Sequence, residues 1–568
     1  MKTIPVSQIA IDEAVNRVRR KFEMTPKVAI AGFGKAGKSS LFNAIYGEEK
    51  AAVSMRTDQT QATQTETRFG IDFTDTPGIG TGAFPEPPML QIVPEDRISA
   101  KPDVGCRLRA AFREEVRRRV GSGDFAAREN VALSLANELV CADLTGALED
   151  LVESHGDGEL MVDGERYRHH AEGCATYHSL AGPLRVRRPS FRKVGQHNGP
   201  TVIPLDKTAG IVERATPAFA QRVAMGKADG PSRDLHRQLA ASHRVTPSRT
   251  TLEAMGQRIG SALSERRVHI EAVARRSEAL PEGARTICLG LDRTSAPMEE
   301  DLPADTPRPQ RKRPRVRKAP PPVTVKYRMA YIGTVSFADA EGEVLTTFKY
   351  GTTRDDGPAA ILHSMMRDVR RALAQDPELR VVVIQDAAKE MWTLLTTALR
   401  AEPSVDRWEE LVDHYHAMGH LWNAADAMEG RTDATMAEWR ASLRESDDAI
   451  DAIALQLEHE TSRGFYRPKY RIAIEDELTF VTNNGARTRY ASLRDAGFPI
   501  GSGPTEGACK SFFSVRCKRS GQRWRNPGLA ATLACRTHLL NDRLPVAMRT
   551  LRRRDYTAVV KPVAKLAA

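Results

Sequence analysis

Hydrophobic and polar positions along this chain follow two different periods, and the period changes several times. Apolar residues recur at helical spacing in residues 8–24, and again between charged residues from about 104 to 155. Continuous apolar runs of the kind found in buried strands occur at 27–32 ("KVAIAG") and within 68–78 ("RFGIDFTDTPG"). The mixture of strand and helix patterns predicts a multidomain α/β protein.

The middle of the chain changes character at several points. Residues 83–103 form a junction that begins with the proline-rich "AFPEPPML". Residues 104–232 combine helical patterns with a glycine-punctuated stretch at 157–205, whose alternating positions predict a small β unit. Residues 233–264 predict a helix, a short turn and a second helix, which is either a DNA-binding helix-turn-helix or a plain helical hairpin.

A second α/β region is predicted from residue 284 to residue 545. Its segment 299–323 is rich in proline and basic residues and lacks periodicity, so we expect a flexible excursion between two strands. Residues 387–500 are expected to be a mainly helical insertion, and residues 546–568 a basic tail. The strand candidates are 284–291, 325–336, 343–349 and 380–385.

The amino-acid composition favours a protein that binds polyanions. The 568 residues include 84 Lys and Arg against 73 Asp and Glu, which gives a formal net charge of +11. A basic surface attracts nucleic acid, although many basic proteins bind none. The hydrophobic content of 41% is ordinary for a soluble globular protein.

The cysteine pattern and the N-terminal sequence indicate where in the cell the protein is located. The 7 cysteines are scattered and form no C-x-x-C pair, which argues against a disulfide framework or a zinc ribbon. The start "MKTIPVSQIAIDEAV" has no apolar core of a signal peptide, and no apolar run approaches the length of a membrane span. We therefore expect a cytoplasmic protein with no membrane partner.

A phosphate-binding loop is predicted near the N-terminus. The stretch "AGFGKAGKSS" satisfies G-x-x-x-x-G-K-[ST] between a predicted strand and a predicted helix, and "DTPG" follows downstream. In such a loop the glycine N–H groups and the lysine meet phosphates, while the serine and aspartate serve magnesium. The nucleotide-binding candidates are Gly32, Gly37, Lys38, Ser39, Thr60, Asp75 and Gly78.

These motifs resemble the Era-like GTPases, and the resemblance covers residues 1–82. It implies GTP as a ligand. The N/T-K-x-D motif with which that family reads guanine is absent downstream, and so are the patterns for the remaining strands of its sheet. Because a truncated sheet keeps an open edge, we favour a vestigial fragment over a working GTPase.

Three acidic residues suggest a different chemistry. Asp292 ends the run "ARTICLGLD", Asp386 ends "RVVVIQD", and Glu506 lies in "IGSGPTEGACKSFF". An aspartate at a strand end is by itself more often a turn or a helix cap. Two carboxylates at strand ends with a third in a first helical turn fit a ribonuclease-H-like fold, which gathers such acids around two divalent cations. We therefore predict that Asp292, Asp386 and Glu506 are catalytic and hold two Mg²⁺ ions.

Basic and aromatic residues near Glu506 are candidate DNA contacts. Trp524 fits either stacking on an unpaired base or, more commonly, packing under the last helix. Arg249 opens the second helix of the 233–264 hairpin, where base contacts would be made. The other candidates for DNA phosphates are Lys510, Arg516, Lys518, Arg519, Arg523 and Arg525.

Two histidines fall inside the predicted insertion. His416 and His420 are four residues apart in "LVDHYHAMGHLWNAADAM", which places them on one face of a helix. Such a pair can bind a metal, but no third ligand stands out. We favour an auxiliary hydrogen-bonding role for both over zinc binding.

The segments "DHYHAMGHLW", "IGSGPTEGACKSFFSVRCKRSGQRW" and "YHSLAGPLRVRRPSF" resemble DDE-type transposases of bacterial insertion sequences, of the Kra group. The resemblance covers roughly residues 90–545. It implies a magnesium-dependent triad of Asp292, Asp386 and Glu506, recognition of terminal inverted repeats and target DNA, and a homo-oligomer on DNA. The chain departs from the family in "SFRKVGQHNG", which lacks the expected cysteines, and in "RTSAPMEE" after Asp292.

Three other functions remain open. A GTP-binding regulator would rest on residues 27–78. A transposase relic that only binds DNA is a second alternative, although all three acids are present. The third is a transposase switched by nucleotide at its N-terminal fragment, for which the sequence shows no coupling.

Overall fold

The structure is a computed structural model of a chain that divides into two compact units, Met1–Glu114 and Glu115–Ala568. Within the backbone ranges given next, side chains are described from residue 107 onward, except at 553–556 and 562. The described backbone covers 27–30, 64–68, 71–75, 104–156, 158–242, 245–302, 323–428, 432–464, 466–556 and 560–563.

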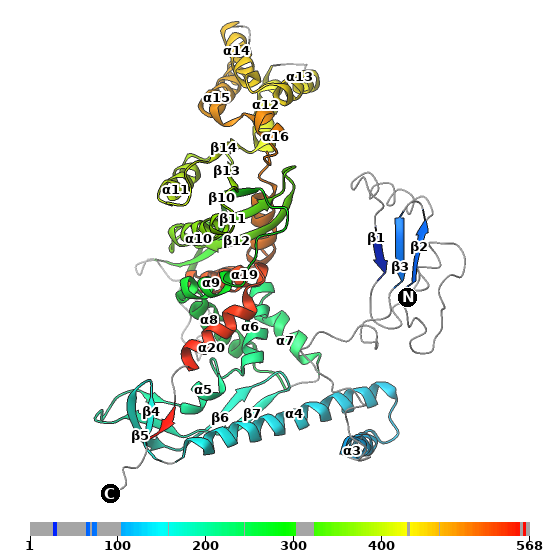
Figure 1. The fold of residues 1–568 in the computed structure, drawn as a ribbon, viewed down its shortest axis with the longest axis vertical. Helices are drawn as coiled ribbons and strands as arrows, with labels where there is room; N and C mark the ends of the chain where they lie inside the picture. Colours follow the sequence, from blue (N-terminus) through cyan, green and yellow to red (C-terminus); the bar gives the residue numbers. More distant parts are fainter. Residues whose placement is uncertain are drawn as a thin grey trace, which may run out of the picture. The chain divides into compact units, whose positions relative to one another are not determined.

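The first unit contains a three-stranded sheet in the order β1-β3-β2 (Figure 1). Its strands are β1 (Lys27–Ile30), β2 (Gln64–Arg68) and β3 (Ile71–Asp75). Strand β1 is parallel to β3, and β2 is antiparallel to β3. Two of these strands were expected from their apolar runs, whereas β2 was not, because "QTETR" has no strongly apolar face.

The second unit starts with two helices and a small β region. Helix α3 (Val104–Val120) crosses the boundary between the units, and α4 (Phe125–His155) follows it. The side chain of Asp124 accepts a hydrogen bond from the Ala127 N–H at 2.9 Å and so caps α4. By length and composition α4 could cross a membrane, which differs from the expectation that no apolar run approaches that length, although a single helix of this kind is weak evidence. Its Leu148 packs in a core with β6, β7 and α5.

The expected β unit at 157–205 consists of six short strands. They form most of a sheet in the order β15-β4-β5-β8-β9 and a hairpin of β6 and β7. The bounds are β4 (Leu160–Val162), β5 (Glu165–Ala171), β6 (Cys174–His178), β7 (Pro183–Arg187), β8 (Ser190–Lys193) and β9 (Thr201–Val202).

A helical layer follows the β unit. Its apolar faces share one core with the last two helices of the chain, α19 (Asn526–Leu540) and α20 (Leu544–Tyr556). The layer consists of α6 (Pro217–Asp229), α7 (Ser232–Ala240), α8 (Arg249–Glu265) and α9 (Arg267–Arg275). The short helix α5 (Pro204–Ala209) precedes it and packs through Leu205 in the core that contains Leu148.

A five-stranded mixed sheet carries the largest core (Figure 1). Its order is β12-β11-β10-β13-β14, in which β10, β11 and β12 are antiparallel neighbours and β10, β13 and β14 are parallel neighbours. The bounds are β10 (Thr286–Asp301), β11 (Val323–Ala338), β12 (Val344–Thr352), β13 (Arg380–Gln385) and β14 (Glu409–Val412).

Two expectations for this sheet were wrong. Strand β10 does not end at Asp292 but continues to Asp301, because β11 pairs with it along its whole length, with Asp292 opposite Ile332. Strand β14 falls where only helix was expected. The excursion expected at 299–323 is strand at both ends, and residues 303–322 lie outside the described part of the chain.

Helices cover both faces of the sheet. A Cβ built on Gly333 would meet Met365 of α10 (Ala359–Gln375), while one built on Gly290 would meet Thr505 of α17 (Gly503–Ala508). Gly290 lies opposite Thr334 in the ladder, so the adjacent Gly333 faces the other side. Helix α10 therefore lies on one face, and α17 on the other.

The insertion after β14 is helical, as expected. Its helices pack through Leu421, Trp439 and Ile453 onto the main core, and Ile474 joins them. The bounds are α12 (His414–Ala427), α13 (Thr432–Glu445), α14 (Ala449–Ser462), α15 (Pro468–Asn484), the turn η2 (Gly485–Arg487) and α16 (Tyr490–Asp495), with α11 (Lys389–Arg400) preceding β14.

The C-terminal segment returns to the sheet and then to the helical layer. Helix α17 runs without a break into the π-helical turn η3 (Cys509–Ser514) and α18 (Val515–Cys517). The expected basic tail is in part structured, since α20 buries Leu551 in the helical core and β15 (Lys561–Pro562) pairs with β4.

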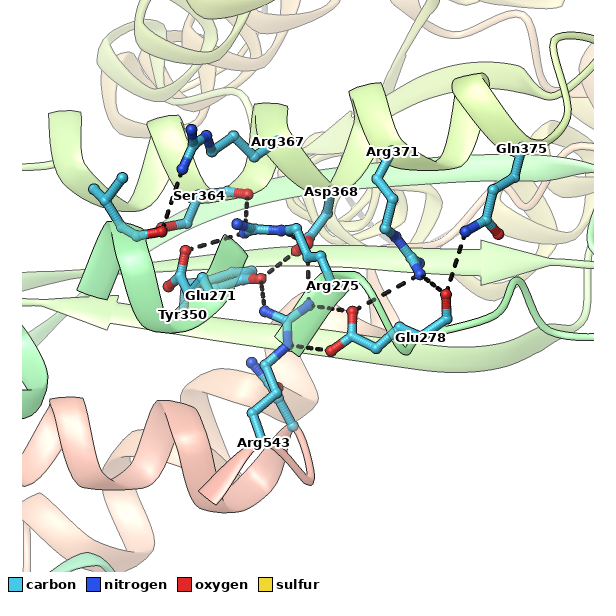
Figure 2. A network of polar contacts seen from close by, with 12 residues as sticks. Glu271, Arg275, Glu278, Tyr350, Ser364, Arg367, Asp368, Arg371, Gln375 and Arg543 are labelled. Carbon is cyan, nitrogen blue, oxygen red and sulfur yellow. Dashed lines mark hydrogen bonds and ion pairs between the residues drawn. The ribbon is translucent and has the colours of Figure 1, made fainter. Parts of the chain in front are cut away.

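A buried network of charges joins the sheet to the helical layer (Figure 2). Asp368 of α10 accepts from Arg275 Nε at 2.6 Å and from Arg543 Nη2 at 3.0 Å. Arg543 also donates to Glu278 at 2.6 Å, and the Tyr350 hydroxyl donates to Asp368. Burial opposes ionisation of Asp368, but Arg543 and Arg275 prevail and hold its pKa below the usual range.

Candidate carboxylate site

Two of the predicted acids lie near the ends of neighbouring strand segments. Leu289 of β10 lies opposite Val383 of parallel β13, where the pairing of the two strands ends. Asp292 is three residues beyond Leu289, and Asp386 directly follows the last residue of β13. Asp292 shares its face with Gly290, two residues earlier, and therefore lies on the α17 face of the sheet.

Close packing seats α17, which carries Glu506, directly on β10. The Thr505 hydroxyl lies 2.7 Å from that of Thr334, and a Cβ on Gly290 would lie only 2.0 Å from it. Glycine at 290 therefore allows the first turn of α17 to rest directly on β10. Glu506, the next residue, is exposed, and its nearest cation is Lys510 at 3.6 Å, one turn along the helix.

A cysteine links the third acid to the first. Cys509 Sγ donates to Asp292 Oδ2 at 3.1 Å. Cys509 is three residues after Glu506, hence on the same side of the helix. Burial first, and then the charges of Asp292 and Glu506, raise the pKa of Cys509, so the thiol stays protonated and can donate.

The three acids do not form a finished metal site in this structure. Asp292 accepts from the Arg293 N–H at 2.6 Å, and Asp386 from the Ala388 N–H at 3.1 Å. Within the described residues, no three His, Cys, Asp or Glu side chains lie close enough to hold a metal ion. Three oxygen donors of this kind suit Mg²⁺ chemically, and side-chain rotation would be needed to bring them to one ion.

Asp413 holds both flanks of the site, and the sequence analysis missed it. Its N–H donates to the carbonyl of Gln385, the residue before Asp386, at 2.8 Å. Its buried carboxylate accepts from the Ser502 N–H, ahead of α17, and caps α12 through the His416 N–H at 2.7 Å. The signal in the sequence was an aspartate directly after the short run "EELV" and before a helix.

Several residues that were predicted to contact DNA make contacts within the protein instead. Arg516 is only 2% exposed and donates to the Lys227 carbonyl, so the expectation that it meets DNA was wrong. Trp524 follows the packing alternative, since it is buried with its indole N–H on the Cys517 carbonyl at 2.9 Å. Arg519 is exposed but pairs with Asp234 at 3.1 Å.

Other basic residues remain at the surface. Lys518 reaches the Thr294 hydroxyl on β10 at 2.6 Å, which places an ammonium group two residues beyond Asp292. Arg525 pairs with Asp301 at 2.9 Å. Arg523 and Lys510 are exposed. These side chains leave positive charge along the segment that follows Glu506.

The hairpin predicted at 233–264 consists of α7 and α8. Ser248 caps α8 by accepting from the Thr251 N–H at 3.2 Å, and Arg249 is exposed in its first turn. Most of α8 is a core helix, because Ile259 and Leu263 are fully buried. Only the start of α8 and one stripe along it are open to a ligand.

The two histidines of α12 belong to a hydrogen-bonded chain. His420 Nδ1 and Glu477 Oε2 are 2.6 Å apart, and His420 Nε2 lies 3.2 Å from His416 Nε2. The His420 ring stacks on Phe480 at 3.6 Å between centroids. This arrangement agrees with the hydrogen-bonding role that we favoured over zinc.

Of the residues predicted to bind nucleotide, the structure describes only Asp75. Asp75 is the last residue of β3, which is parallel to β1, the strand that leads into the predicted loop. The remaining candidates, Gly32, Gly37, Lys38, Ser39, Thr60 and Gly78, lie outside the described residues.

Comparison with known proteins finds one family. A family model described as a 50S ribosome-binding GTPase matches residues 27–120, from the first residue of β1 to the last residue of α3. No curated protein matches the chain. The match includes the phosphate-loop motif and extends past residue 82, where we expected the similarity to end. A GTPase-family segment is therefore present at the N-terminus, and it covers a minor part of the chain.

Proposed function

We propose that residues 115–568 form a metal-dependent DNA strand transferase of the DDE transposase type, with a ribonuclease-H-like catalytic domain. The observation that supports this proposal is the packing of α17, which carries Glu506, on β10, which carries Asp292, together with the hydrogen bond from Cys509 to Asp292. Asp386 directly follows β13, the parallel neighbour of β10. The strand order β12-β11-β10-β13-β14, with three antiparallel strands followed by two parallel ones, supports the same assignment.

The three carboxylates would hold Mg²⁺. Bound divalent cations in such sites activate a water for attack on a phosphodiester and stabilise the leaving oxygen. Cys509 holds Asp292 in place through its thiol, and Asp413 ties the backbone beside Asp386 to the loop before Glu506. Lys510 and Lys518 present ammonium groups that attract a DNA phosphate toward the carboxylates.

Strand cleavage with and without the third acid tests this proposal. The substrate is a supercoiled plasmid that carries the DNA flanking the coding sequence. We expect Mg²⁺-dependent nicking by the full chain and a loss of roughly 1,000-fold in Glu506→Gln, since such cations contribute several kcal/mol. The control is Glu438→Gln, an exposed acid on α13. Equal nicking by Glu506→Gln and the parent would refute the assignment.

A second candidate function is GTP binding by residues 27–120, which the family match favours. Binding of a fluorescent GTP analogue to the full chain, compared with Lys38→Ala, tests it. Binding that Lys38→Ala abolishes would support a nucleotide site. The absence of binding by both proteins would agree with the vestigial fragment that the missing guanine motif indicates.

A further inference from the structure

A cavity separate from the candidate carboxylate site lies where the helical layer meets the mixed sheet. Its volume is about 220 Å³, and its lining residues come from α8, α9, α19, the end of β12 and the start of α10. A space of about 15 Å³ already admits one water molecule, so this cavity has room for a group of several atoms. Asp292, Asp386 and Glu506 do not line it.

Arg267 at the start of α9 brings an uncompensated positive charge to this cavity. Its side chain forms no hydrogen bond or ion pair within the part of the chain that the structure describes, and its Nε is buried. Ala360, in the first turn of α10, lines the same cavity. Because the start of a helix carries partial positive charge, both features favour an anion as the ligand.

His538 of α19 provides a second nitrogen without a partner. The residue is 1% exposed and lines the cavity, and its Nδ1 has no hydrogen-bond partner among the described residues. Burial first, and then the charges of Arg543, Arg267 and Arg275, lower the pKa of His538 to about 3, so the ring is neutral. A neutral imidazole carries one N–H, which an oxyanion can accept. Since buried polar groups are nearly always hydrogen-bonded, these two nitrogens indicate a ligand that accepts hydrogen bonds.

Asp356 narrows the choice of anion. This exposed residue lines the cavity between β12 and α10. Its carboxylate accepts from the Thr353 hydroxyl at 2.8 Å and forms no ion pair with any described residue. An ionised carboxylate only accepts hydrogen bonds. It therefore repels sulfate and the phosphodiesters of DNA, which carry no O–H at neutral pH, whereas inorganic phosphate keeps an O–H that it can donate.

We propose that this cavity binds inorganic phosphate, with Arg267 and His538 as donors and Asp356 as the acceptor of the phosphate O–H. Thr352 and Thr537 also line the cavity and carry hydroxyls that can donate. The bound ion joins α9, α19 and the connection between β12 and α10. It stabilises the folded chain, because a ligand that binds only the folded state shifts the folding equilibrium toward that state. The site does not depend on the proposed strand transfer.

Titration calorimetry of the full chain with inorganic phosphate and with sulfate tests this site. We expect phosphate to bind more tightly than sulfate by roughly tenfold or more, because sulfate leaves the Asp356 carboxylate without a donor. Arg267→Gln should weaken phosphate binding by roughly tenfold, since charge-assisted hydrogen bonds are the stronger kind. The matched control is Arg276→Gln, which removes an exposed arginine at the end of the same helix and should leave phosphate binding unchanged.

Asp356→Asn tests the selectivity without removing a buried group. An amide can donate to sulfate, so this variant should bind sulfate more tightly than the parent does and phosphate more weakly. Equal affinity of the parent for the two anions would overturn the proposal, and so would an Arg267→Gln variant that binds phosphate like the parent. Displacement of phosphate by a short DNA duplex would also contradict it, because a phosphodiester would then occupy the cavity.

Discussion

Two groups of carboxylates in residues 115–568 differ in the partners that they have. Asp368 is fully buried and bonded to Arg275, Arg543 and Tyr350 (Figure 2). Asp292 and Asp386 are half-buried and accept hydrogen bonds from neutral N–H and S–H groups, without an ion pair among the described residues.

This difference separates the acids that stabilise the fold from those that can bind a ligand. A buried carboxylate that is saturated by arginines has no capacity for a further cation. Asp292 and Asp386 lack cationic partners among the described residues, and Glu506 is exposed with only Lys510 near it at 3.6 Å, so their oxygens are open to a ligand. The first group is therefore structural, and the second is the candidate site.

The largest expected effect concerns the structural group. Asp368→Ala leaves two buried arginines without their shared partner, and we expect the free energy of unfolding to fall by about 3–5 kcal/mol. Urea unfolding of the full chain measures it. Asp386→Asn, the matched change in the other group, should alter stability by less than about 0.5 kcal/mol. Equal destabilisation by both changes would remove the distinction.

Gly290→Ala tests the contact that seats α17 on the sheet. The new Cβ would lie 2.0 Å from the Thr505 hydroxyl, so α17 must shift away and carry Glu506 with it. Because a displacement of about 1 Å can cost 10²-fold in rate, nicking should fall by roughly 100-fold. Adding Thr505→Ala removes the clashing hydroxyl and should restore part of the activity. A single variant with full activity would contradict this account of the packing.

Substitutions of Asp413 should reduce nicking by a smaller factor. They distinguish loss of a hydrogen-bond acceptor from loss of the negative charge. Asp413→Ala removes the acceptor for the Ser502 and His416 N–H groups, and we expect nicking to fall by roughly tenfold, equivalent to about 1.4 kcal/mol. Asp413→Asn keeps one acceptor oxygen and should retain more activity. If both variants behave like the parent in the nicking assay, Asp413 does not position the site.

The sequence predicted the strands of this sheet better than it predicted their lengths. The apolar runs before Asp292 and Asp386 located β10 and β13. The continuation of β10 beyond Asp292 was missed, because "RTSAPMEE" lacks clean alternation and is held by pairing with β11. Pairing between segments far apart in sequence leaves little signal in either one.

The neighbourhood of the site was harder to predict than the acids. Arg516 has the composition of a phosphate contact, yet the fold buries it against Trp524 and the Lys227 carbonyl. Asp413 gave only the weak signal of a helix cap, because its bonds to Gln385 and Ser502 join parts of the chain that only tertiary structure brings together. Burial and long-range backbone contacts cannot be read from local composition.

The central claim is that Asp292, Asp386 and Glu506 bind one metal centre together. Replacing Mg²⁺ with Fe²⁺ and adding ascorbate generates radicals that cut the protein backbone beside the bound ion, so the cut positions map its ligands. We predict cuts near all three residues, suppressed by added Mg²⁺ and lost in Glu506→Gln. Cuts near only one of the three, or cuts that persist in excess Mg²⁺, would contradict the account.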